Sequence, residues 1–247
     1  MKGVIVATGL GHYLSPLTRY CPRLLVSVLK RPLVDYAIEA FARAGFEEVA
    51  VVLGPNGDVL RHYLEESERY GIAVYCLYNG QYPRGNATSI DAARAFVGGE
   101  PFVVAMADHL VSPRIVLTLL GRPRLSHVLC VSRQTRAGAV PYDATKVWMD
   151  QHGRVQRIGK RLKHWHAVDG GVFLFQPRVF DHLSDLVHRF DGHCSITSLA
   201  RHMIRSSDDL YTCDVSGGFW VDVDTRDKPI CMQQVLTVGL AGEELVA

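Results

Sequence analysis

The chain opens with a short apolar run that passes into a glycine-rich turn, KGVIVATGLG, residues 2–11. The run contains β-branched residues, which is typical of a buried strand. Glycines directly after such a strand let the backbone bend sharply and approach a ligand closely. In an α/β sheet this turn lies at the carboxyl edge, where ligands bind, and its free amides suit nucleotide phosphates. The residues after the glycines complete neither the dinucleotide-binding fingerprint nor the P-loop motif. An ordinary connection from strand to loop is therefore the alternative.

Strand and helix patterns alternate through the first 110 residues or so. Apolar runs at 48–53, 73–78 and 101–107 predict buried strands, and the patterns over 32–44, 59–70 and 86–96 predict helices. This alternation favours an α/β fold with a Rossmann-like, mostly parallel sheet that helices cover on both faces.

The second half of the chain has a different pattern. Two alternating runs at 145–149 and 155–158 flank the turn DQHG, residues 150–153, and predict a β-hairpin. Further strands are expected at 126–133, 167–176, 210–215 and 219–223, and helices at 177–190, 195–205 and 225–240. We find no linker or repeat, so the sequence predicts one domain, residues 1–247, with a nucleotide-binding half (1–110) and a hairpin-bearing substrate half (111–247).

Composition excludes several classes of partner. The 247 residues carry a formal charge of +2, which gives no reason to expect nucleic acid. No apolar run approaches the roughly 20 residues that cross a bilayer, so no membrane partner is expected, and the N-terminus has no signal-peptide pattern. The six cysteines are scattered without a Cys-x-x-Cys pair. We therefore expect reduced, mostly buried thiols in a cytoplasmic protein rather than a metal cluster.

Carboxylates follow two of the predicted strands. Asp108 comes after the apolar run 102–106, and Asp222 and Asp224 come at the end of the segment 218–221. Carboxylates at the carboxyl edge, beside a phosphate site, suit Mg²⁺, which prefers oxygen ligands and bound phosphates. The alternative is that Asp108 is a turn residue and Asp224 a helix cap.

Cationic side chains lie near the same segments. Arg19, Arg23 and Lys30 flank the glycine-rich turn, and Lys160 follows the predicted hairpin directly after Gly159. Arginine offers phosphate a fixed fork of donors, while lysine acts as a point charge. Each of them could equally be a solvated surface charge.

With these residues in place, the chain resembles the sugar-phosphate nucleotidylyltransferases over nearly its whole length. The resemblance begins with GLGHYLSPLT (9–18), CPRLL (21–25) and KRPL (30–33). Later stretches resemble one branch, the CTP:inositol-1-phosphate cytidylyltransferases, and these are NATS (86–89), MADH (106–109), IGKRL (158–162), AVDGGVF (167–173) and WVDVDT (220–225).

The resemblance implies attack by an acceptor phosphate oxygen on the α-phosphate of a nucleoside triphosphate, CTP being favoured, with release of pyrophosphate. It implies Mg²⁺ on Asp108 and Asp222, and Arg23 in the place of a family lysine. Lys160, Asp169 and Gly170 would hold the acceptor, a small phosphorylated polyol or sugar, in the half 111–247. The implied nucleotide-binding residues are Ala7, Gly9, Leu10, Gly11, Asn86 and Ser89. A homo-oligomer is a further expectation.

The chain departs from the family pattern at the first loop. His12-Tyr13 stands where the family has Thr-Arg, so the forked charge of that arginine is missing. Two alternatives to a cytidylyltransferase therefore stay open. One is a transferase that joins UTP or dTTP to a hexose 1-phosphate, and the other is a non-catalytic subunit that binds a nucleotide or sugar phosphate and regulates a partner enzyme.

Overall fold

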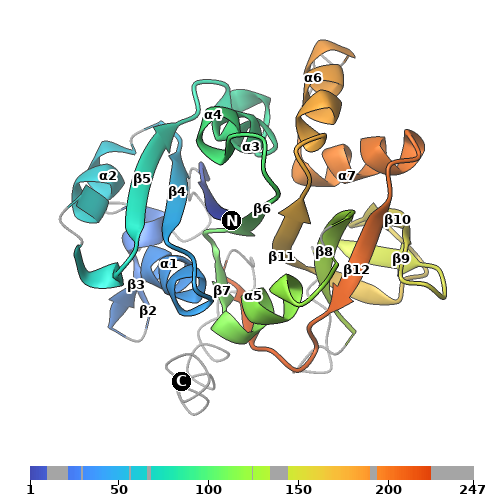
Figure 1. The fold of residues 1–247 in the computed structure, drawn as a ribbon, viewed down its shortest axis with the longest axis horizontal. Coiled ribbons are helices and arrows are strands. Elements are labelled where there is room, and N and C mark those ends of the chain that lie inside the picture. Colours follow the sequence, from blue (N-terminus) through green and yellow to red (C-terminus); the bar gives the residue numbers. More distant parts are fainter. Residues whose placement is uncertain are drawn as a thin grey trace.

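A computed structural model describes residues 1–9, 22–28, 30–55, 57–65, 68–123, 125–133, 144–189 and 194–223. Within these ranges nine strands form one mixed sheet, which helices flank (Figure 1). The main path of the sheet runs β10-β9-β11-β6-β1-β4-β5, and β8 pairs with both β11 and β12. The predicted α/β fold is therefore confirmed.

The strands of this sheet are β1 (Lys2–Ala7), β4 (Glu48–Leu53), β5 (Ala73–Tyr78), β6 (Phe102–Met106), β8 (His127–Ser132), β9 (Lys146–Met149), β10 (Val155–Gly159), β11 (Ala167–Phe175) and β12 (Leu210–Asp214). Two small ribbons pair β2 (Ser27–Val28) with β3 (Arg31–Pro32), and β7 (His109–Val111) with β13 (Trp220–Asp222). The helices are α1 (Leu33–Arg43), α2 (Asp58–Glu65), α3 (Thr88–Ala92), α4 (Arg94–Val97), α5 (Pro113–Leu120), α6 (Val179–Arg189) and α7 (Ile196–Arg205). Short 3-10 turns cover Arg23–Leu25, Glu68–Tyr70 and Tyr82–Arg84.

Four strands, β6, β1, β4 and β5, run parallel in the first half of the chain. Their side chains alternate between two apolar cores, one on each face of the sheet. Ile5 packs in the core with α1, α2 and α5, whereas Val4 and Val6 pack in the core with α3, α4, α6 and α7. In Figure 1 α1 and α5 lie below the strands and α3, α4, α6 and α7 lie above them. Burial on both faces explains why β1, β4 and β6 are continuous apolar runs, whereas β5 is at the edge of the sheet and its Tyr75 and Tyr78 are exposed.

Strand β11 joins the two halves of the sheet. It pairs antiparallel with β6, with β8 and, over its first residues, with β9. Its register against β8 shifts between Asp169 and Phe173, where Gly170 and Gly171 interrupt the apolar run. The predicted hairpin is confirmed as β9 and β10, which pair antiparallel. The helix expected at 86–96 is divided at Ala93 into α3 and α4, and the helix expected at 225–240 lies outside the described residues.

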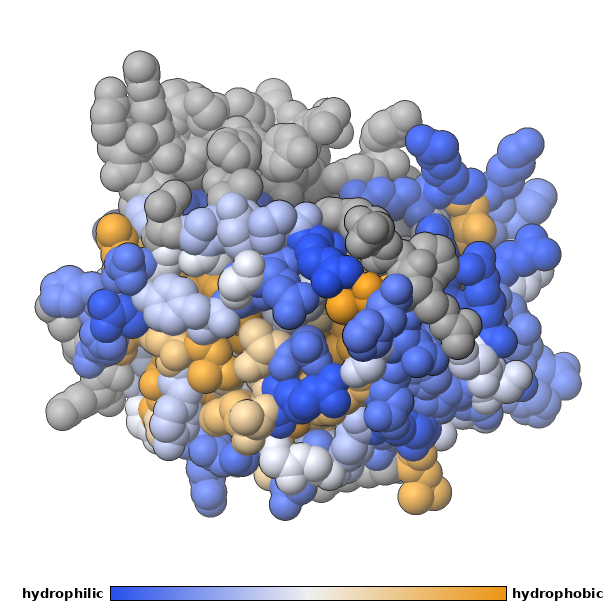
Figure 2. Space-filling model, turned by 90° about the horizontal axis from the view of Figure 1, so that it is seen from above, coloured by the Kyte–Doolittle hydropathy of each residue, from blue (hydrophilic) through white to orange (hydrophobic). Residues whose placement is uncertain are grey.

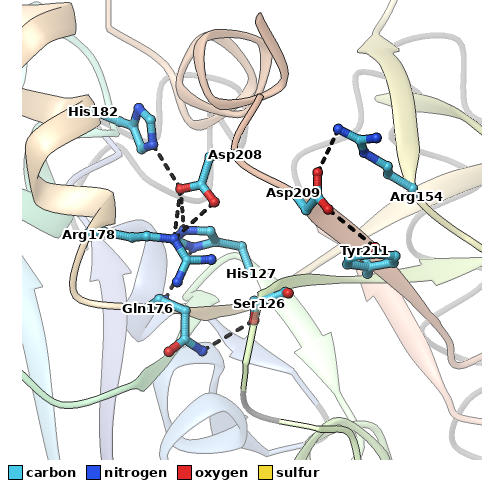
Figure 3. Close-up of polar contacts among 9 residues, drawn as sticks. All are labelled: Ser126, His127, Arg154, Gln176, Arg178, His182, Asp208, Asp209 and Tyr211. Carbon is cyan, nitrogen blue, oxygen red and sulfur yellow. Dashed lines mark hydrogen bonds and ion pairs between the residues drawn. The ribbon is translucent and has the colours of Figure 1, made fainter. Parts of the chain in front are cut away.

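A buried polar cluster ties α6 and the start of β12 to the sheet (Figure 3). His127, which has no exposed surface, accepts at Nδ1 from the Gln176 amide at 3.2 Å and donates from Nε2 to Asp208 at 3.0 Å. Asp208 also receives hydrogen bonds from Arg178 Nε at 2.9 Å and His182 Nε2 at 2.9 Å. Burial, together with the charge of Arg178, lowers the pKa of His127 to about 4, although Asp208 opposes the shift.

This shift predicts a loss of stability in mild acid. Between pH 6.5 and about 4 the unfolded chain protonates His127 and the folded chain does not, so the free energy of unfolding falls as the pH falls. The full effect is about 3 kcal/mol at about 1.4 kcal/mol per pKa unit. Urea unfolding at pH 7 and pH 5 should show the loss, and His127→Gln should show a smaller one. Equal losses in the two proteins would contradict this assignment.

Within the described part of the chain, no helix has both the length and the apolar character needed to cross a bilayer. Figure 2 views the molecule from above, and in this view the right half is mostly hydrophilic, while apolar side chains gather left of centre.

Candidate active site

The carboxyl ends of β1 and β6 meet at one edge of the sheet. Val6 and Met106 are partners in the parallel register, and the Ala107 amide bonds the Val6 carbonyl at 3.0 Å. This pairing places Gly9 and Asp108 at the same edge, as the sequence predicts. A Cβ on Gly9 would lie 3.6 Å from Nη1 of Arg23, so the glycine-rich turn begins directly against the Arg23 guanidinium.

Arg23 and Asp108 form a buried ion pair. Nη2 of Arg23 lies 2.8 Å from Oδ2 of Asp108, and the two side chains are 4% and 20% exposed. Burial alone would raise the pKa of Asp108, but the hydrogen bond and charge of His109 and the Arg23 guanidinium outweigh it and hold this pKa well below its usual range. Asp108 is therefore an ionised carboxylate with both oxygens engaged.

His109 lies between Asp108 and Asp222, and sequence analysis did not identify it as a site residue. The β7–β13 ribbon pairs Asp222 with His109 in register. Nδ1 of His109 is 3.1 Å from Asp108 Oδ1, and Nε2 is 3.9 Å from Asp222 Oδ2. Burial would lower the pKa of His109, but Asp222, Asp108 and Asp169 together raise it to about 9. The ring is therefore an imidazolium at neutral pH.

Asp169 completes the carboxylate group from β11. Its Oδ1 accepts from the Gly171 amide at 2.8 Å. Burial, together with the charge of Asp222, raises the pKa of Asp169 to about 6, although Gly171 and His109 oppose the shift. The site thus gathers Asp108, Asp169 and Asp222 against the cations Arg23 and His109.

Gly171 allows β11 to approach His109. Its φ of +73° is in the left-handed region, and a Cβ there would lie 3.0 Å from His109 Cε1. Gly171→Ala is expected to lower the free energy of unfolding by about 2–4 kcal/mol, combining roughly 1–2 kcal/mol of backbone strain with crowding of the imidazole. Gly45→Ala is the matched control, because Gly45 has a φ of +83° with nothing within 4 Å. Urea unfolding of both variants separates backbone strain from crowding of the imidazole. Equal losses of unfolding free energy in the two variants would argue against the contact with His109.

Asp108 and Asp222 offer carboxylate oxygens, which are the kind of ligand that Mg²⁺ prefers. Mg²⁺ needs only one or two protein carboxylates and takes its other ligands from water and substrate phosphates. In the described ranges no group of three His, Cys, Asp or Glu side chains forms a ready-made metal site.

A buried polar network lies behind the end of β1. Oγ of Ser89 is 3.0 Å from Oγ1 of Thr8 and accepts from Nδ2 of Asn79 at 3.1 Å. The predicted nucleotide-binding residues Ala7 and Ser89 therefore both border the glycine-rich turn. Asn86 is engaged differently, since its Oδ1 accepts from the Ile196 amide at the start of α7 at 2.9 Å. Its role toward a nucleotide stays a prediction.

The remaining predicted residues lie further along the chain. Lys160 is exposed in the turn after β10. Gly170 is buried in β11, where a Cβ would lie 3.3 Å from the Cys130 carbonyl oxygen. Leu10, Gly11, Asp224, His12, Tyr13 and Arg19 lie outside the described residues.

Sequence relatives match at least 90% of this chain. The sequence is 31% identical over 243 residues to the "Bifunctional IPC transferase and DIPP synthase" of Rubrobacter xylanophilus, covering 97% of this chain and 53% of the relative. It is 24% identical to a glucose-1-phosphate thymidylyltransferase of Streptomyces antibioticus, over 90% of this chain and 62% of that protein. The chain thus spans about half to three-fifths of these relatives' lengths.

The structure superposes on the inositol-1-phosphate CTP transferase from T. maritima with a TM-score of 0.80, at 21% identity and 95% coverage of both chains. This likeness supports the fold. A sequence model of the family "Nucleotidyl transferase" matches residues 2–233, which confirms the predicted enzyme class. The chain belongs to the nucleotidyl transferase family.

Proposed function

We propose that this chain transfers CMP from CTP to the phosphate of inositol 1-phosphate or a similar polyol, with Mg²⁺, and releases pyrophosphate. The observation that supports it most is the group formed by Arg23, Asp108, His109, Asp169 and Asp222 beside the start of the glycine-rich turn. The names of the R. xylanophilus and T. maritima relatives agree with the choice of substrates.

Such a reaction needs two polyanions held in line while their repulsion is neutralised. Arg23 is a fixed, buried cation next to Gly9, so it would contact the phosphates that approach the turn. Asp108 and Asp222 would hold Mg²⁺, which supplies further neutralising charge on the α-phosphate. Asp169 would accept hydrogen bonds from acceptor hydroxyls, and Lys160 would bind the acceptor phosphate.

His109 accounts for how three carboxylates share one site that binds anions. Arg23 and His109 carry two positive charges against the three negative charges of Asp108, Asp169 and Asp222. The net charge of these five side chains is therefore −1, and one Mg²⁺ ion would make it positive. A site with a net positive charge attracts a triphosphate.

The test is pyrophosphate release with Mg²⁺ from CTP, UTP, ATP, GTP and dTTP. Each nucleotide is paired with inositol 1-phosphate, glucose 1-phosphate or no acceptor. Release that needs both CTP and inositol 1-phosphate is the expected result. Release with UTP or dTTP and glucose 1-phosphate would instead establish the hexose reaction. No release from any pair, with measurable nucleotide binding, would overturn catalysis in favour of a regulatory subunit.

A further inference from the structure

Two cysteines face each other across neighbouring strands beside the proposed acceptor segment of β11. Cys130 on β8 and Cys213 on β12 are direct partners in the parallel register. Neither has any exposed surface, and both side chains belong to the same apolar core, so they point to the same face of the sheet. Neighbouring strands lie about 4.8 Å apart, which falls within the Cα separations that a disulfide spans, about 4.4–6.8 Å.

The surroundings of the two thiols differ in a way that gives them different roles. Arg122, an exposed residue just after α5, donates from Nε to Cys213 Sγ at 3.4 Å. The hydrogen bond from Cys130 and the Arg122 guanidinium together lower the pKa of Cys213 to about 6, although burial opposes them. Burial raises the pKa of Cys130. The hydrogen bond from Arg122 thus favours ionisation at Cys213 over Cys130.

The other described cysteines lack such an arrangement. Burial raises the pKa of both Cys76 and Cys194, and neither is the register partner of another cysteine. They therefore serve as internal controls for thiol reactivity.

We propose that Cys130 and Cys213 form a redox-modification site that hydrogen peroxide converts to a disulfide. The Cys213 thiolate attacks one peroxide oxygen, which gives a sulfenic acid and releases hydroxide. The Cys130 sulfur then attacks the Cys213 sulfur, its proton leaves with the hydroxyl group as water, and the sulfur–sulfur bond forms. In sum, two thiols and one peroxide give one disulfide and two waters.

Strand β8, which carries Cys130, lies directly beside β11 in the sheet. A Cβ on Gly170 would be 3.3 Å from the Cys130 carbonyl oxygen and 3.8 Å from its Cβ, and Val131 pairs in register with Asp169. A disulfide would hold the two Cβ atoms about 3.8 Å apart and so shift β8 against the segment that carries Asp169. Resting on the proposed function, this predicts a raised KM for the acceptor phosphate with the KM for CTP unchanged.

The test follows the disulfide itself, so it stands whether or not the proposed reaction is found. The full chain is treated with hydrogen peroxide, alkylated, digested and analysed by mass spectrometry. The expected product is a Cys130–Cys213 linked peptide, two hydrogens lighter than the sum of its parts, that dithiothreitol reverses. Cys76 and Cys194 should remain alkylated. Alkylation of both Cys130 and Cys213 after treatment, or oxidation of Cys213 without linkage, would overturn the proposal.

The role of Arg122 is tested by rate. Arg122→Ala keeps both thiols and should slow formation of the linked peptide at least tenfold at neutral pH. Arg205→Ala, a matched change at an exposed arginine of α7, should leave the rate unchanged. Equal rates in the two variants would contradict activation of Cys213 by Arg122.

Discussion

Asp108→Asn is expected to reduce kcat by at least about a thousandfold, or about 4 kcal/mol of transition-state stabilisation. Asparagine keeps the shape of the side chain and removes the charge that would hold the metal. It also leaves Arg23 facing a neutral amide at the position where Nη2 now lies 2.8 Å from the carboxylate. Pyrophosphate release under saturating substrates, with Mg²⁺ varied, measures the effect.

Asp58→Asn is the control for this change, because the Asp58 side chain is 77% exposed at the start of α2 and far less constrained. It should leave turnover unchanged. Asp108→Asn breaks a buried ion pair, so a loss of stability of about 3 kcal/mol is expected as well. Circular dichroism and urea unfolding establish that the variant is folded under assay conditions. A folded Asp108→Asn protein with unchanged turnover would remove this residue from the metal site.

Arg23→Ala should lower kcat/KM by about 10²–10³, the cost of deleting one preorganised donor to developing charge. The side chain is nearly fully buried and its guanidinium adjoins both Asp108 and Gly9. Free guanidinium ion should restore part of the rate of the alanine variant. The measurement is kcat/KM for the nucleotide triphosphate, with Arg205→Ala as a surface control.

Arg23→Lys makes this prediction more specific. The family that the sequence resembles has a lysine at this position. The kcat/KM of the lysine variant should therefore stay within about tenfold of that of the parent. If Arg23 serves only to neutralise Asp108, alanine would mainly reduce stability and leave kcat/KM of the folded protein nearly unchanged. That result would exclude contact between Arg23 and the phosphates.

Sequence patterns predicted the regular elements where local and global preferences agree. The runs at 48–53 and 73–78 coincide with β4 and β5, and the hairpin agrees to within one residue at each boundary. Helix α5 was not predicted, although Ser112-Pro113 before an apolar segment is a helix-start signal. Strand β13 falls within the strand predicted at 219–223, but its partner β7 was not predicted, because a three-residue strand that pairs with a segment about 110 residues away has almost no local pattern.

The difference between local pattern and long-range pairing also explains which site residues the sequence predicted and which it did not. Asp108 and Gly9 could be placed together because parallel strands end at one edge. His109 was missed because its role depends on β13 returning Asp222 to it. Asn86 was predicted to bind the nucleotide, but its side-chain oxygen accepts a hydrogen bond from an amide 110 positions away. No local pattern indicates this long-range contact.

The hairpin of β9 and β10 has a consequence for how this fold diversifies. It joins the sheet through two residue pairs with β11, Val147 with Ala167 and Lys146 with Val168. Arg201 fixes its far strand by a 2.8 Å bond to the Ile158 carbonyl, and Arg133 contacts Met149 Sδ at 3.7 Å. These attachments all come from the second half of the chain. A graft of a relative's hairpin would therefore exchange the turn that carries Lys160 and leave β1 and β6 intact. Under the proposed function, in which Lys160 binds the acceptor, exchange of this one module would alter the choice of acceptor and leave the nucleotide-binding edge of the sheet unchanged.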